Sequence, residues 1–114
     1  MKEQFSHLSP CWNLGEDGRT PTPTDDYLAW AQWMIKIELR RVALDVDDVN
    51  EVAVSTVFLG TLGSLFVGKP MFYQTMIFGG PHAGYEKRYS TWEEAEEGHN
   101  KACEHAGVQC KEDK

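Results

Sequence analysis

Residues 52–92 decide the fold of this chain, because they contain three candidate strands and the start of a helix. The stretch begins VAVSTVFLG at residues 52–60, continues after a glycine-rich break as PMFYQTMIFGG at residues 70–80, and ends YEKRYSTW at residues 85–92. β-Branched and aromatic residues dominate its first two segments, and these residue types favour strands. Alternation of side chains in the first segment predicts a strand with two distinct faces.

A further strand is predicted immediately before this stretch. Residues 40–46 alternate loosely between apolar and other side chains, and the turn Asp47-Asp48-Val49-Asn50 separates them from a strand at residues 51–59. Residues 71–78 are apolar on both faces, which predicts a central or covered strand, and residues 85–89 form a short last strand. The pattern predicts a four-stranded antiparallel meander.

Two helices flank the predicted sheet. The first should span residues 24–39 with Thr24 as its N-cap, and it is apolar over much of its circumference. We expect it to bury against the sheet, either completely or with part of its surface left for self-association or a partner. The last helix should begin after Ser90, with Glu93 completing a capping box, and end at Gly107.

The N-terminal region predicts a smaller element. Extended segments at residues 11–14 and 19–23 surround an Asp-Gly turn, which indicates a short hairpin or an ordered arm. With 114 residues, one domain is the natural expectation. The fold class is therefore predicted as one α+β domain: a four-stranded antiparallel meander sheet with two helices packed on it, plus this hairpin or arm. Residues 1–10 and 108–114 are expected to be flexible.

Charge and composition restrict the class of partner. Lys and Arg number 11 against 18 Asp and Glu, so the formal net charge is −7, which disfavours direct contact with nucleic acid or anionic lipid. It is compatible with a basic protein partner. The start of the chain lacks a long apolar run, and no run approaches the roughly 20 residues needed to span a bilayer, so we expect a cytoplasmic protein without membrane contact. Three cysteines make no even disulfide framework and fit a reducing compartment.

Residues that could carry catalysis or hold a metal are sparse. His99 and Cys103 lie four apart on one helix face, a spacing that can hold a metal. However, His105 lies away from that face and no Cys-x-x-Cys pair accompanies them. We therefore expect a histidine at the edge of the core and unreactive thiols, with no metal and no other cofactor. No nucleophile elbow or phosphate-binding loop is present, so an enzyme is less expected than a binding protein.

Three runs of the chain are long and ordered enough to suggest a family: VSTVFLG at residues 54–60, TMIFGG at residues 75–80 and RYSTWEEAEEGH at residues 88–99. They resemble a group of small, functionally uncharacterised proteins of bacteriophages and prophages. The resemblance implies an accessory protein made in an infected bacterium, and it transfers no activity. Members of the group usually carry an Asp-His pair after the equivalent of Gly60, where this chain has Thr61-Leu62, which makes an enzymatic role less expected here.

These observations predict a small acidic protein that binds a host or phage protein, for example one with a basic nucleic-acid-binding surface, and thereby inhibits a bacterial antiviral defence system. The partner-binding residues are predicted in a loop, a turn and the acidic start of the last helix: Leu65, Phe66, His82, Glu93, Glu94, Glu96 and Glu97. One alternative is a ligand-binding or enzymatic domain with a pocket between the sheet and the first helix, using Tyr73, Gln74 and His82. Another is a homodimeric structural protein.

Overall fold

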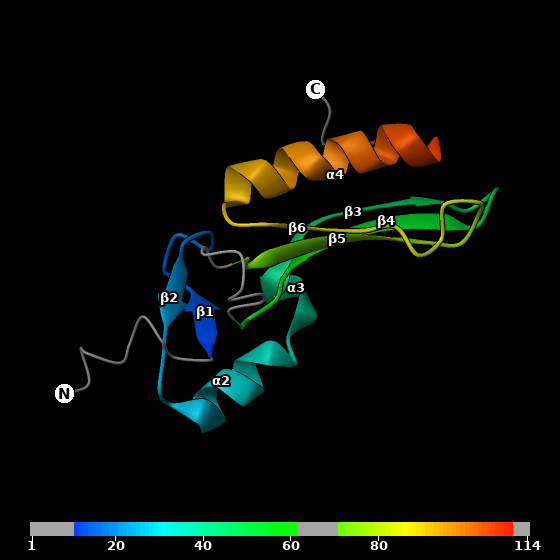
Figure 1. Cartoon of the computed structure of the whole chain (residues 1–114). Coiled ribbons are helices and arrows are strands. Elements are labelled where there is room, and N and C mark those ends of the chain that lie inside the picture. The colour runs from blue at the N-terminus through cyan, green and yellow to red at the C-terminus, as the bar shows by residue number, and fades with distance from the viewer. Residues whose placement is uncertain (1–10, 62–70, 111–114) are drawn as a thin grey trace.

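The structure is a computed structural model that describes residues 11–61 and 71–110. Its main sheet contains four antiparallel strands in the order of the chain (Figure 1). They are β3 (Arg41–Asp47), β4 (Val52–Phe58), β5 (Tyr73–Phe78) and β6 (Glu86–Tyr89). The predicted meander and the α+β class are confirmed.

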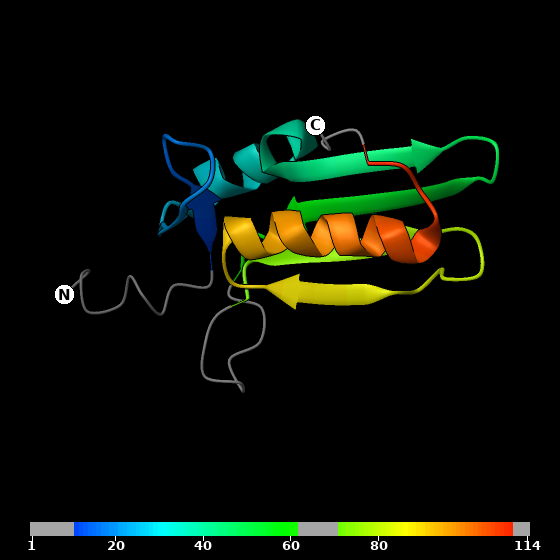
Figure 2. The same ribbon diagram turned by 90° about the horizontal axis from the view of Figure 1, so that it is seen from above.

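Helix α4 (Trp92–Ala106) crosses one face of the sheet and runs along the central strands (Figure 2). Its N-cap is Thr91, whose hydroxyl accepts from the N–H of Glu94 at 3.1 Å, while the Glu94 carboxylate accepts from the backbone of Thr91. The predicted box of Ser90 with Glu93 is therefore wrong by one residue. Thr91 is still extended, with φ −120° and ψ 160°, so the helix begins one residue later than expected. Gly107 ends the helix in the left-handed conformation, as predicted.

The N-terminal hairpin is confirmed as β1 (Trp12–Leu14) paired with β2 (Pro21–Pro23). It lies beside α2 (Tyr27–Met34) at one end of the main sheet, and α2 is on the side opposite α4 (Figure 1). No helix in residues 11–61 and 71–110 has the length and apolar character needed to cross a bilayer.

The predicted first helix is shorter and less buried than expected. It ends at Met34, and a separate short helix α3 (Ile37–Arg40) follows Lys36, whose ψ of 82° breaks the helical path. The N-cap of α2 is Asp26 rather than the predicted Thr24. The helix contacts the end of the sheet through tryptophans, and Trp33 meets Phe58 edge to face at 5.9 Å. None of its residues is fully buried, so complete burial against the sheet is wrong.

The face of the sheet under α4 carries two apolar clusters, one toward each end. The cluster beside the N-terminal hairpin consists of Trp12, Leu14, Phe58, Phe72, Tyr73, Tyr89 and Ala95, with Trp33, Val42 and Trp92 packed against it. The cluster toward the other end consists of Val52, Val54, Ile77, Ala102, Cys103 and Val108, with Tyr85, Ala106 and Cys110 packed against it. Val108, expected in a flexible tail, is 6% exposed.

The opposite face of the sheet has no described helix over much of its area (Figure 1). Val46, Ala53 and Phe78 are register partners across β3, β4 and β5, so they form one row on this face. Val46 is 47% exposed and Phe78 is 51% exposed. Strand β5 is central, as predicted, and on this face it is buried at Gln74 (8% exposed) but open at Phe78.

Candidate functional site

A layer of buried polar side chains separates the two apolar clusters. Along β4, Thr56 lies between Val54 of one cluster and Phe58 of the other. On β5 the register partner of Thr56 is Thr75, and on α4 the layer is completed by His99. Thr56, Thr75 and His99 are all 0% exposed. Burying polar groups is unfavourable unless they are hydrogen-bonded. The hydrogen bonds among these side chains therefore explain how the layer can be buried.

His99 is held at both ring nitrogens. Its Nδ1 lies 2.7 Å from Oγ1 of Thr56, and its Nε2 lies 2.8 Å from Oδ2 of Asp45, which is 1% exposed on β3. Oγ1 of Thr56 lies 2.5 Å from Oγ1 of Thr75. The imidazole of α4 therefore contacts β3 and β4 directly, and Thr56 connects it to β5.

The direction of each hydrogen bond in this row of side chains follows from the chemistry of Asp45 at one end. A carboxylate of Asp45 only accepts, so Nε2–H of His99 donates to it. In a neutral imidazole Nδ1 then accepts from the hydroxyl of Thr56, and Oγ1 of Thr56 accepts from Thr75. Reversal of the tautomer would reverse both hydroxyls and would leave an unprotonated Nε2 facing the Asp45 carboxylate, so without a cation between these two atoms the first arrangement is the favourable one.

Two thiols adjoin the carboxylate. Sγ of Cys103 lies 3.9 Å from Oδ2 of Asp45, one helical turn after His99. Cys110 reaches the same place because the chain turns back after Gly107 and runs toward β3 on the α4 side (Figure 2). One donor atom from each of Asp45, His99, Cys103 and Cys110 lies within 4.8 Å of the others.

The thiol of Cys103 is poorly ionised in this setting. Burial raises its pKa above the ordinary 9.0, and the neighbouring Cys110 and Asp45 raise it further. At neutral pH the thiol is therefore protonated and a weak nucleophile, as the sequence predicts for an unreactive cysteine. Catalysis by a free thiolate of Cys103 receives no support from the geometry.

The sequence missed this cluster because Asp45 comes from a distant strand. In the sequence His99 and Cys103 have no further donor on their helix face, and Asp45 is 54 residues from His99 along the chain. A usable signal was present: in β3 an acidic residue alternates with Ala43 on the face under α4, while Leu44 and Val46 lie on the other face. An acidic residue on the covered face of a strand requires a buried partner.

The predicted partner-binding residues are not brought together. Leu65 and Phe66 lie outside the described residues. His82 is half-buried in the turn after β5, where its ring lies 4.1 Å from that of His105. The acidic residues lie at the first half of α4, where Glu94 is engaged in the helix cap, Glu96 is half-buried, and Glu93 and Glu97 are exposed.

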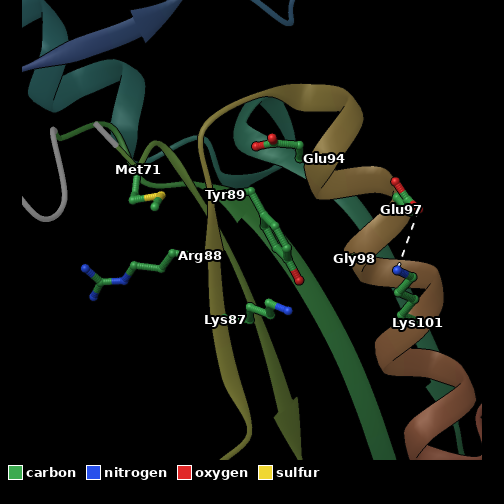
Figure 3. A pocket seen from close by; sticks show the side chains of 8 residues that line it. All are labelled: Met71, Lys87, Arg88, Tyr89, Glu94, Glu97, Gly98 and Lys101. Carbon is green, nitrogen blue, oxygen red and sulfur yellow. Dashed lines mark ion pairs between the residues drawn. The ribbon is translucent and has the colours of Figure 1, made fainter. Parts of the chain in front are cut away.

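A groove of about 290 Å³ lies between β6 and α4 (Figure 3). Basic side chains on its walls neutralise part of the acidic charge of α4. Lys101 pairs with Glu97 across 3.7 Å, and Lys87 lies on the opposite wall. The ring of Tyr89 fills the bottom, and a Cβ on Gly98 would lie 2.2 Å from its Cζ, so glycine permits this close packing. The groove is open and of mixed charge, which gives it no evident ligand.

The alternative pocket between the sheet and the first helix is not formed by its predicted residues. Tyr73 is fully buried on the α4 side of β5, and its hydroxyl donates to the carbonyl of Arg19 at 2.5 Å. Gln74 lies on the opposite face of the same strand and donates to Glu86 at 2.5 Å. With His82 near the far end of α4, the three side chains share no cavity.

Comparison with known proteins adds no relative. No family model, curated protein or solved structure matches the chain significantly. Function is therefore inferred from the residues and their arrangement.

Proposed function

We propose that this chain is a non-enzymatic binding protein whose partner is another protein. Following the resemblance to phage proteins, we propose further that it is a phage accessory protein and that its partner belongs to a bacterial antiviral defence system, which it inhibits. Protein binding receives support from the structure's surface, whereas the phage origin and the identity of the partner rest on the resemblance alone.

The observation that carries protein binding is the uncovered apolar face of the sheet. Exposed antiparallel sheet faces usually carry polar side chains. Here the row of Val46, Ala53 and Phe78 is apolar, and the next row contains Leu44 and Met76 around Ser55. Contiguous apolar surface of this kind on a small domain marks a contact site.

The first two helices carry more exposed apolar residues, toward the other end of the sheet from the row of Val46 and Phe78. They lie on the same side of the sheet (Figure 1). Leu28 is 72% exposed, Ile35 is 79% exposed and Leu39 is 48% exposed. The sequence pattern suggested that this helix contributes a partner surface, and the exposed residues support that alternative over complete burial.

The acidic start of α4 lies on the other side of the sheet (Figure 1). One flat partner therefore cannot cover both Glu93 and the row at Phe78. We place the principal contact on the uncovered sheet face. Glu93 and Glu97 form a second surface, to which a basic protein could bind separately.

The test uses affinity-tagged full-length protein in bacterial lysate, with co-purifying proteins identified by mass spectrometry. Wild type should retain one stoichiometric protein, and Val46→Lys/Phe78→Lys should lose it because charge on the apolar rows prevents close packing. Val49→Ser is the matched control, since Val49 is 89% exposed in the β3–β4 turn rather than on the sheet face. Glu93→Lys/Glu97→Lys tests the acidic surface separately.

Three results would contradict the proposal in different ways. Absence of any stoichiometric partner would remove the basis for protein binding. Loss of binding in the glutamate variant alone would move the contact to α4. A dimer of the purified protein in light scattering that Val46→Lys/Phe78→Lys converts to monomer would assign the sheet face to self-association, which is the homodimer alternative.

A further inference from the structure

We propose that Asp45, His99, Cys103 and Cys110 form a binding site for a single Zn²⁺ ion. This inference is independent of the proposed protein binding. It rests on the donor atoms, their separation, the groups that orient them and the route by which an ion reaches them.

The separation of the donors fits one ion. Bond lengths of about 2.0–2.3 Å to oxygen, nitrogen and sulfur place the corners of a tetrahedral zinc site about 3.3–3.8 Å apart. The four donor atoms here already lie within 4.8 Å of one another, so small side-chain rotations suffice. His99 and Asp45, now 2.8 Å apart, need only separate slightly to admit an ion between Nε2 and Oδ2.

The donor set selects the metal. Two thiolates and an imidazole favour zinc over Mg²⁺ or Ca²⁺, which prefer oxygen ligands only. Four protein ligands close the coordination sphere, which is typical of a structural rather than a catalytic site. On binding, the Cys103 and Cys110 thiols each release a proton to solvent, and two thiolates with one carboxylate leave a net charge of −1 around the ion.

The buried hydroxyl layer provides the support that zinc-bound histidines normally have. Nε2 of His99 would bind the ion, and its proton would be carried on Nδ1, which then donates to Thr56. Thr56 in turn donates to Thr75. At the open side, the Cys110 thiol donates to Oδ1 of Asn100 at 3.2 Å, and this hydrogen bond would be given up when the thiol loses its proton to bind the ion.

Two cavities give access to the cluster from its two sides. A cavity of about 360 Å³ is bordered by Cys103 and Cys110. A smaller one of about 130 Å³ is bordered by His99 and Ala43. An ion bound between them would join the edge strand β3, helix α4 and the segment after Gly107, which otherwise meet without a covalent link.

The first experiment measures the metal in the full-length protein. The chain is purified without a polyhistidine tag, from zinc-supplemented cells, under reducing conditions and without chelator. Elemental analysis and native mass spectrometry should find one zinc per chain. Titration of the chelator-treated protein with Zn²⁺ alone, in competition with a chromophoric chelator, should give the same stoichiometry, and Co²⁺ should produce the absorption of a tetrahedral site with thiolate ligands.

Single-residue variants distinguish zinc binding at these four residues from nonspecific metal binding elsewhere on the protein. Cys110→Ser should abolish stoichiometric zinc and lose cobalt–thiolate absorption, and Cys110 is only partly buried near the chain end, so the fold should persist in circular dichroism. Cys11→Ser is the matched control, because Cys11 is a buried thiol in the N-terminal hairpin region outside the cluster. Thr56→Val removes the hydroxyl behind His99 and should weaken zinc binding about 10–100-fold.

Several results would overturn the site. They are a zinc-free wild type in both experiments, equal zinc retention by Cys110→Ser, and an X-ray absorption spectrum without two sulfur neighbours. A Cys103–Cys110 disulfide under reducing conditions, seen as the loss of two hydrogens in the intact mass, would also exclude it.

Discussion

At the residue scale, two aspartates show how local and distant contacts differ. Asp17 is exposed in the β1–β2 loop, and its carboxylate accepts from the N–H groups of Arg19 and Thr20 and from the Thr20 hydroxyl. Every one of these donors lies within three residues, so the sequence neighbourhood alone supplies them. Asp45 instead depends on His99, which is 54 residues away.

The contacts of Asp17 predict a pH dependence. The Thr20 hydroxyl, followed by the two N–H groups, lowers the pKa of Asp17 from 3.8 to about 2. Since the folded value lies below the unfolded one, the stabilising contribution of this carboxylate is complete above pH 3.8 and is lost as the pH falls through about 2. NMR titration of the side-chain carboxyl should show this low value.

Removing the Thr20 hydroxyl, which is the largest cause of the lowered pKa of Asp17, tests this explanation. Thr20→Val should bring the pKa of Asp17 back toward 3.8. Thr22→Val serves as the control, because the Thr22 hydroxyl donates to the carbonyl of Thr20 and not to Asp17. An unchanged titration in Thr20→Val, or an equal change in both variants, would contradict the mechanism.

At the element scale, the start of α4 depends on which residue is the last extended one. The sequence Ser90-Thr91-Trp92-Glu93-Glu94 permits two overlapping capping boxes, and pattern alone does not distinguish them. The structure selects Thr91 with Glu94: β6 ends at Tyr89, Thr91 still has an extended backbone, and the first helical residue is Trp92. Burial of Ala95, Gly98 and His99 under the helix then fixes its rotation.

This choice of cap predicts different effects for neighbouring substitutions. Thr91→Ala should reduce the free energy of unfolding by about 1 kcal/mol, because the N–H of Glu94 loses its side-chain acceptor. Ser90→Ala should cost less than Thr91→Ala, because Thr91 supplies the cap acceptor whereas the Ser90 hydroxyl donates to Sδ of Met71 at 3.6 Å. Chemical denaturation of both variants is the measurement, and a larger loss in Ser90→Ala would favour the alternative box.

At the scale of the whole molecule, the polar layer couples the helix to the sheet. His99 of α4 contacts Asp45 of β3 and Thr56 of β4, and Thr56 contacts Thr75 of β5. The apolar clusters on either side could be formed by many hydrophobic sequences, whereas this layer is satisfied in one register only. We infer that it helps to fix the position of α4 along the strands.

A double-variant cycle measures this coupling. Asp45→Leu and His99→Leu should each lower the free energy of unfolding by about 3–5 kcal/mol, because each leaves a buried polar group without its partner. The double variant should lose about 1–3 kcal/mol less than the sum. Denaturation is measured with a chelator present, so that metal binding does not contribute, and His105→Leu is the control on an exposed histidine of the same helix.

Additivity of the two substitutions would contradict the coupling. It would mean that Asp45 and His99 are stabilised by separate surroundings rather than by each other. The chelator also separates this experiment from the zinc site, because the hydrogen-bonded layer is present without an ion.

Local patterns in the sequence were enough to predict the strands, the hairpin turns, the end of α4 at Gly107 and the α+β class. These features depend on alternation, turn residues and helix caps, whose interacting groups lie a few residues apart. The packed fold was needed to show that the first helix ends at Met34, that Leu44 and Val46 face away from α4, and that Asp45 lies beside His99 and two cysteines. The physical reason is that side-chain pairs between distant segments depend on strand register and helix placement, which no local pattern encodes.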